Sequence, residues 1–79
     1  MRFLNVGYGS LVSEDRIIAI CSPESAPVKR VITDAKSQGK LVDVTSGKKT
    51  QAVIITDSDH VILSALSSES LGEKLKEGK

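Results

Sequence analysis

The sequence has 79 residues, a formal net charge of +1, one cysteine and one histidine. A chain of this length forms one small domain that buries about 60 to 65% of its unfolded surface, so an isolated copy gains little stability from its core. One cysteine excludes an internal disulfide, and one cysteine with one histidine falls short of the ligands of a structural zinc site. We therefore expect no metal or other cofactor, and we expect self-association to supply further stability.

Charges of the two signs are separated along the chain. Residues 1–50 contain eight lysine and arginine residues against five acids, whereas residues 51–79 contain three against five. No apolar stretch is long enough for a signal peptide or a membrane span, and a single free thiol suits a reducing compartment. We expect a cytoplasmic protein that does not contact a membrane.

The first third of the chain contains three short strand patterns. Residues 3–6 and 11–13 are rich in strand formers and flank a glycine-rich turn, and residues 16–21 form a further apolar run that Arg16 opens. The two glycines of the turn lack the third glycine and the following helix of a dinucleotide-binding loop. The pattern therefore indicates strands rather than a nucleotide site.

A helix is expected to begin near Pro27. Pro23 and Pro27 keep residues 22–27 irregular, and proline is well suited to the first turn of a helix. Gly39 follows the expected last turn, as glycine often does. The i, i+3, i+4, i+7 spacing of one apolar face is provided by Val28, Val31, Ile32 and Ala35.

Three further apolar runs, at residues 41–44, 51–56 and 60–66, are separated by two short polar breaks. We expect them to form adjacent antiparallel strands. The first break is then a hairpin loop whose ends are fixed by the strands and whose tip places Lys48 and Lys49 in solvent.

The last two of these runs are continuously apolar rather than alternating, which predicts cover on both faces of the sheet. The helix near Pro27 covers one face. The tail offers only Leu71 and Leu75, four residues apart, as further helical anchors. We therefore expect symmetric assembly to bury the remaining apolar surface.

These patterns predict an α+β fold with a small, mostly antiparallel sheet, one main helix and a short C-terminal helix capped by Ser67 or Ser68. We divide the chain into a β-rich domain at residues 1–66 and a short helix and tail at residues 67–79.

Enzyme chemistry has little support in the sequence. His60 is the only histidine, and the aspartates that precede it are explained by a turn. The segment Gly47-Lys48-Lys49-Thr50 resembles the end of a phosphate-binding Walker loop, but Val42 stands where that loop requires glycine. We expect a protein that is not an enzyme.

The basic turn favours binding to a polyanion. Repetition of Lys48 and Lys49 in an oligomer would multiply contacts to nucleic-acid phosphates, and Arg16 is a further candidate phosphate contact beside them. Phe3 and Tyr8 are the only aromatic residues, too few to stack the bases of single strands. We expect double-stranded DNA as the partner, contacted through its backbone.

Distinctive blocks occur at residues 5–9, 16–20, 22–30 and 57–65, and their most specific parts are Ser-Pro-Glu-Ser-Ala-Pro at residues 22–27 and Asp-Ser-Asp-His at residues 57–60. Through these blocks the chain resembles the RemA family of bacterial regulators of extracellular-matrix and biofilm genes. The resemblance spans residues 3–66. It implies a β-rich subunit that forms a closed homo-oligomeric ring, binds promoter DNA through repeated basic residues and activates transcription.

The resemblance places the family's basic turn on Lys48 and Lys49 and its strand-leading arginine on Arg16. The family pattern at the turn is Gly-Arg-Arg-Thr-Arg, whereas this chain has two lysines and then Gln51 at the arginine positions. Lysine keeps the charge but loses the bidentate fork of arginine. Two alternatives remain open: a scaffolding homo-oligomer that binds no nucleic acid, and an enzyme that uses His60 at a subunit interface.

Overall fold

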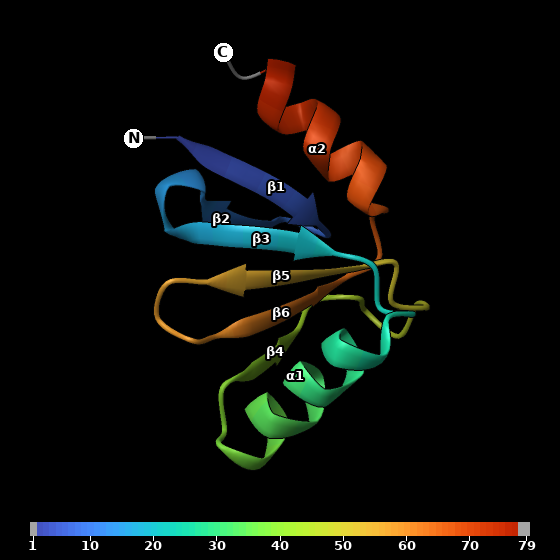
Figure 1. Cartoon of the computed structure of the whole chain (residues 1–79). Coiled ribbons are helices and arrows are strands. Elements are labelled where there is room, and N and C mark those ends of the chain that lie inside the picture. Colours follow the sequence, from blue (N-terminus) through green and yellow to red (C-terminus); the bar gives the residue numbers. More distant parts are fainter. Residues whose placement is uncertain (1, 78–79) are drawn as a thin grey trace.

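Six strands and two α-helices make up the part of the chain that the computed structural model describes, residues 2–77 (Figure 1). A short 3-10 turn at Glu14–Arg16 precedes the third strand. The elements agree with the predicted small α+β fold. In chain order they are β1 (Phe3–Gly7), β2 (Ser10–Ser13), β3 (Ile17–Cys21), α1 (Ala26–Ser37), β4 (Leu41–Asp43), β5 (Ala52–Thr56), β6 (Val61–Ser64) and α2 (Ser68–Glu77).

The main sheet has the strand order β3-β5-β6-β4, and β1 and β2 form a separate antiparallel hairpin. β5 pairs antiparallel with β3 on one side and with β6 on the other. β4 pairs parallel with β6. The prediction that β4 and β5 are neighbours joined by a hairpin loop is therefore wrong. Both edges of β5 are already paired, with β3 and β6, and β4 lies at the outer edge of β6 instead.

Side chains of β5 point alternately into two apolar clusters, as its continuous apolar run predicts. Val53 packs with Ala35 of α1 and Val61 of β6 on one face. Ile54 packs on the other face with the hairpin residue Val6 and with Leu71 of α2. Val53, Ile54, Val6 and Leu71 have no exposed surface. The need for cover on both faces is confirmed.

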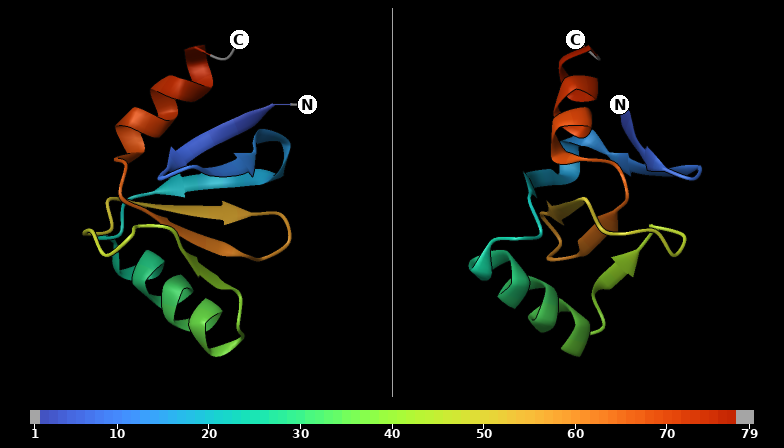
Figure 2. Two further views of the ribbon diagram at one scale, coloured as in Figure 1. Left: turned by 180° about the vertical axis from the view of Figure 1, so that it is seen from behind. Right: turned by 90° about the vertical axis from the view of Figure 1, so that its right-hand side faces the viewer.

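The inference that a second copy must cover the second face is wrong, because the β1–β2 hairpin and α2 cover it within one chain (Figures 1 and 2). A buried hydrogen bond joins the hairpin to the sheet: Ser64 Oγ donates to the Val6 carbonyl oxygen at 2.7 Å. Ser64 Oγ also accepts a hydrogen bond from Leu66 N at 3.1 Å. The turn into α2 is thus fixed at the point where hairpin and sheet meet.

Both helices begin where the sequence predicts. Pro27 lies in the first turn of α1, and Gly39 follows its end with φ of +73°. Ser67 Oγ accepts a hydrogen bond from Ser70 N at 3.1 Å, which is the geometry of a helix cap. No helix among residues 2–77 is long and apolar enough to cross a membrane.

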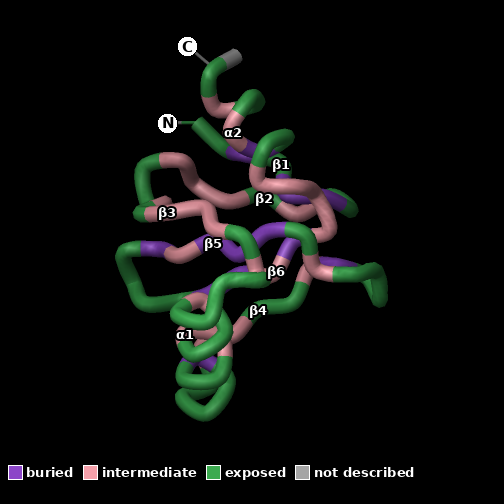
Figure 3. Tube along the Cα trace, turned by 45° about the vertical axis from the view of Figure 1, so that its right-hand side comes forward, coloured by how far each residue is buried: buried purple, intermediate pink, exposed green. Residues whose placement is uncertain are grey.

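Figure 3 colours the chain by burial, and large apolar residues are among the exposed positions of the hairpin and of both edge strands of the main sheet. On the hairpin, Phe3 and Leu11 are 55% and 60% exposed. Ile18 of edge strand β3 is 67% exposed and lies at a register shift in the pairing with β5. Val42 of β4, the opposite edge strand of the main sheet, is 42% exposed.

The buried position of Leu71 makes it the main anchor of α2. We expect Leu71→Ala to lower the free energy of unfolding by about 2 to 5 kcal/mol, because removal of the leucine side chain leaves a cavity between α2, β1 and β5. Leu75→Ala, at a partly buried position of the same helix, is the matched control and should cost less. Urea denaturation at one fixed protein concentration measures both, and equal decreases would contradict the assignment.

Candidate nucleic-acid interface

The segment between β4 and β5 crosses the end of β6 and is fastened to that strand at both of its ends (Figure 2). Val44 N donates to the Leu63 carbonyl oxygen at 3.0 Å, and Gln51 N donates to the Ser64 carbonyl oxygen at 2.8 Å. These two bonds hold the crossing segment, which we define as residues 44–51. The basic turn at its centre therefore stands on a fixed base although it is not a hairpin loop.

A tight reverse turn forms the tip of the crossing segment. Lys48 N donates to the Thr45 carbonyl oxygen at 3.0 Å, and the two residues between them have positive φ, +54° at Ser46 and +81° at Gly47. Two successive positive φ angles are typical of a type I′ turn, for which glycine carries no steric penalty. The turn leaves Lys48 and Lys49 exposed, as predicted (Figure 3).

Asp43 and Thr45 fix the start of the turn, and the sequence reasoning missed both. Thr45 is only 2% exposed. Its hydroxyl donates to Asp43 Oδ1 at 2.6 Å, and its backbone N–H donates to the same oxygen at 2.9 Å. The hydroxyl bond and then the backbone bond lower the pKa of Asp43 below its ordinary value. The Asp-x-Thr spacing at the end of a strand, which favours such a turn, was the available signal.

Arg16 does not lie beside the lysine turn within one chain. It precedes β3, which runs antiparallel to β5, so it lies where β5 ends whereas the crossing segment lies where β5 begins. Five residues of extended strand separate the two ends by roughly 17 Å. The expected proximity is wrong within the subunit. The Arg16 side chain is 69% exposed, and its Nη1 lies 3.6 Å from Asp57 Oδ2.

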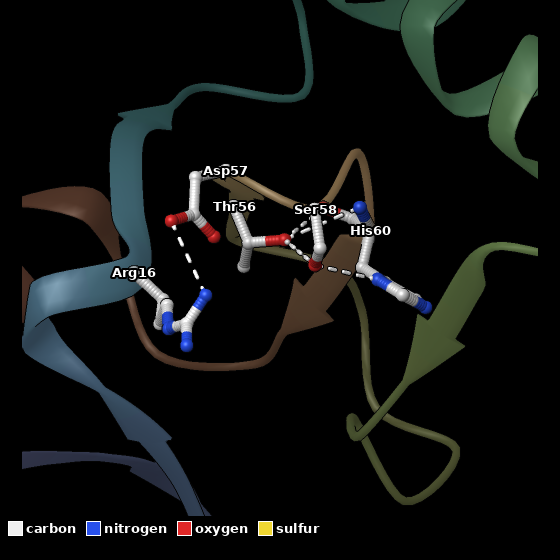
Figure 4. A network of polar contacts seen from close by, with 5 residues as sticks. All are labelled: Arg16, Thr56, Asp57, Ser58 and His60. Carbon is white, nitrogen blue, oxygen red and sulfur yellow. Dashed lines mark hydrogen bonds and ion pairs between the residues drawn. The ribbon is translucent and has the colours of Figure 1, made fainter.

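The turn between β5 and β6 is held by its own polar side chains (Figure 4). Thr56 Oγ1 accepts from His60 N at 3.2 Å, and Ser58 Oγ lies 2.8 Å from His60 Nδ1. The predicted role of this segment as a turn is confirmed. Among residues 2–77, no group of three or more histidine, cysteine or acidic side chains is placed to hold a metal ion.

The low pKa of Asp43 predicts a pH dependence of the turn. A group whose pKa is lowered by folding contributes stability that is complete above its unfolded pKa and is lost as the pH falls through its folded pKa. We expect the Thr45 amide signal to titrate with a midpoint below the ordinary aspartate value, measured by NMR. In Asp43→Asn this titration should be absent. A wild-type midpoint at or above the ordinary value would contradict the assignment.

Comparison with known proteins places the chain in a family. The family model described as "RemA-like: Extracellular matrix regulatory protein A-like" matches residues 3–75. A protein of Geobacillus thermodenitrificans named "Putative regulatory protein" is 60% identical over 75 residues, which cover 95% of this chain and 86% of that protein.

Other bacteria carry similar proteins under the same kind of name. The relative in Thermoanaerobacter sp. strain X514 is 51% identical over the whole of this chain and 82% of its own length. The relative in Rippkaea orientalis is 55% identical over 94% of this chain and 83% of its own length. With a family match from residue 3 to residue 75, the chain belongs to the RemA-like family.

Proposed function

We propose that the protein is a DNA-binding transcriptional regulator that works as a homo-oligomeric ring and activates genes of the extracellular-matrix type. The observation that carries the proposal is the basic turn: Lys48 and Lys49 are exposed on a loop whose two ends are hydrogen-bonded to β6. The family match and the names of the relatives support a regulatory role.

Backbone contact to duplex DNA suits the chemistry of the turn. Lysine ammonium groups act as point charges for phosphate oxygens, and each neutralised phosphate releases counterions and strengthens binding at low salt. Arg16, with a mostly exposed side chain, is the third proposed contact. Its exposed pairing with Asp57 is weak enough for a phosphate to replace it.

A single copy presents too few charges for firm binding. Two lysines lie at one end of β5 and the arginine at the other, so one duplex gains many contacts only where several copies stand side by side. Repetition of the subunit around a ring supplies those copies.

The exposed apolar side chains support a closed assembly of the head-to-tail kind. Phe3, Leu11 and Ile18 lie on the hairpin and on β3, whereas Val42 lies on β4. β3 and β4 are the two opposite edges of the main sheet. Contact between two different edges of identical subunits is heterologous, and such contacts generate rings when the rotation closes.

Salt-dependent DNA titration tests the DNA proposal. We expect the wild-type protein to bind a promoter-length duplex at low salt, and we expect the double variant Lys48→Ala, Lys49→Ala to bind much more weakly. The slope of log affinity against log salt should shrink by about 0.9 for each phosphate that the variant no longer neutralises. The matched control is Lys36→Ala with Lys76→Ala, two exposed lysines on the helices.

No binding by the wild-type protein at low salt would reject the DNA proposal and favour a scaffolding oligomer. Equal decreases in affinity in the two double variants would reject the lysine turn as the contact.

The edge-to-edge contact has its own test. Ile18→Glu and Val42→Glu both alter exposed positions, so the fold should persist while each variant alone becomes monomeric, because a glutamate carboxylate is costly to bury. A mixture of the two should form a heterodimer, since each partner keeps one intact edge. Light scattering after size-exclusion chromatography measures all three masses. Wild-type mass retained in both variants would refute this interface.

A further inference from the structure

A cavity of about 390 Å³ lies between the crossing segment and the loop that connects β3 to α1. Three separate parts of the chain form its walls, so its shape depends on the fold rather than on one flexible loop. The lining residues are Ser22, Pro23 and Glu24 from the β3–α1 loop, Lys29 from α1, and Lys49, Thr50 and Gln51 from the crossing segment. We call this cavity the lysine pocket.

The lining of the lysine pocket is suited to an oxyanion. Lys29 and Lys49 bring two ammonium groups from different elements, and hydroxyl and amide side chains add neutral hydrogen-bond donors. None of the described residues that line the pocket is aromatic, and the one ring among them belongs to Pro23. A nucleobase would therefore find no stacking surface, whereas a phosphate would find donors.

Lys29 lines the lysine pocket from the first turns of α1. Its N–H donates to the Ser25 carbonyl oxygen at 3.0 Å, and Thr33 Oγ1 donates to its carbonyl oxygen at 3.1 Å. Arg30, the next residue, lines a different hollow on the helix, together with Ala26, Pro27, Val31 and Asp34. The adjacent basic residues Lys29 and Arg30 thus line two different hollows of the surface.

We propose that the lysine pocket receives a backbone phosphate of the bound duplex, with Lys29 and Lys49 as its cationic contacts. This inference rests on the proposed DNA-binding function and extends it. Lys29 becomes a fourth DNA contact, from a helix that the sequence reasoning assigned only a structural role. The proposal also restricts the path of the duplex, because the DNA backbone must pass across the β3–α1 loop beside the lysine turn.

Glu24 opposes the phosphate from the wall of the same pocket. Its exposed carboxylate repels an incoming anion, an effect that salt screens. Glu24 therefore limits affinity, and its removal should change DNA binding in the direction opposite to the removal of Lys29.

Two adjacent residues of equal charge provide the test. Lys29→Ala and Arg30→Ala each remove one positive charge from the same turn of α1, so a general electrostatic effect weakens binding equally in both. Direct contact predicts that Lys29→Ala binds the promoter duplex about fivefold more weakly than Arg30→Ala, the factor a surface ion pair supplies. Glu24→Gln should bind more tightly than the wild type, whereas Glu73→Gln, at an exposed acid on α2 outside the pocket, should change binding less.

Equal affinities of Lys29→Ala and Arg30→Ala, alongside wild-type binding that depends on Lys48 and Lys49, would overturn the lysine pocket and leave the proposed function standing. No DNA binding by the wild type would reject both. In a second experiment, inorganic phosphate and a mononucleotide are each titrated into the wild-type protein at constant ionic strength. The Thr50 and Gln51 amide signals are followed by NMR. Weak binding of both with equal affinity supports a phosphate site, and much tighter binding of the mononucleotide would overturn it in favour of a small-molecule site.

Discussion

Burial of β5 on both faces is the constraint on which the rest of the structure depends. A five-residue strand with the sequence Ala-Val-Ile-Ile-Thr has no polar face to expose to water, so the chain must supply two covers. α1 provides one, and the β1–β2 hairpin with α2 provides the other. Because Ser64 links the Val6 carbonyl to the turn that leads into α2, the second cover is attached by a directional bond as well as by apolar packing.

The same constraint places the basic residues. β5 has β3 on one edge and β6 on the other, so the chain that leaves β4 must pass across the end of β6 to reach it. Two backbone bonds to β6 fix this passage, and the Asp43–Thr45 pair fixes the turn inside it. The lysines are therefore presented by a loop with little freedom, which reduces the conformational entropy that binding has to overcome. Arg16 is placed at the other end of β5 by the antiparallel pairing of β3.

Local sequence patterns were sufficient to predict the helices and strands, but they were insufficient to predict which strands pair with one another. Pro27, Gly39 and Ser67 mark helix boundaries because each acts on the backbone within a few residues of itself. The pairing of β4 depends on which edges of β5 and β6 are already taken, a property of distant segments. The cover that the hairpin provides was not predicted for a related reason: Leu4 and Val6 alternate with the exposed Phe3 and Asn5, so only a few residues of a short strand face the core. The sequence did not identify Lys29 as a candidate phosphate contact, because a charged residue on an amphipathic helix usually only faces solvent.

The presence of lysine rather than arginine at the turn affects which features of a duplex the proposed interface can recognise. A guanidinium fork can pair with two acceptors on one base edge, whereas an ammonium group mainly follows negative potential. Gln51 lines the lysine pocket and contributes no charge. Lys29 brings a charge to the same space from α1. Two point charges from different elements can hold a phosphate without fixing its orientation. In the proposed DNA complex, this surface would therefore contact the backbone and leave sequence preference to the shape and deformability of the duplex.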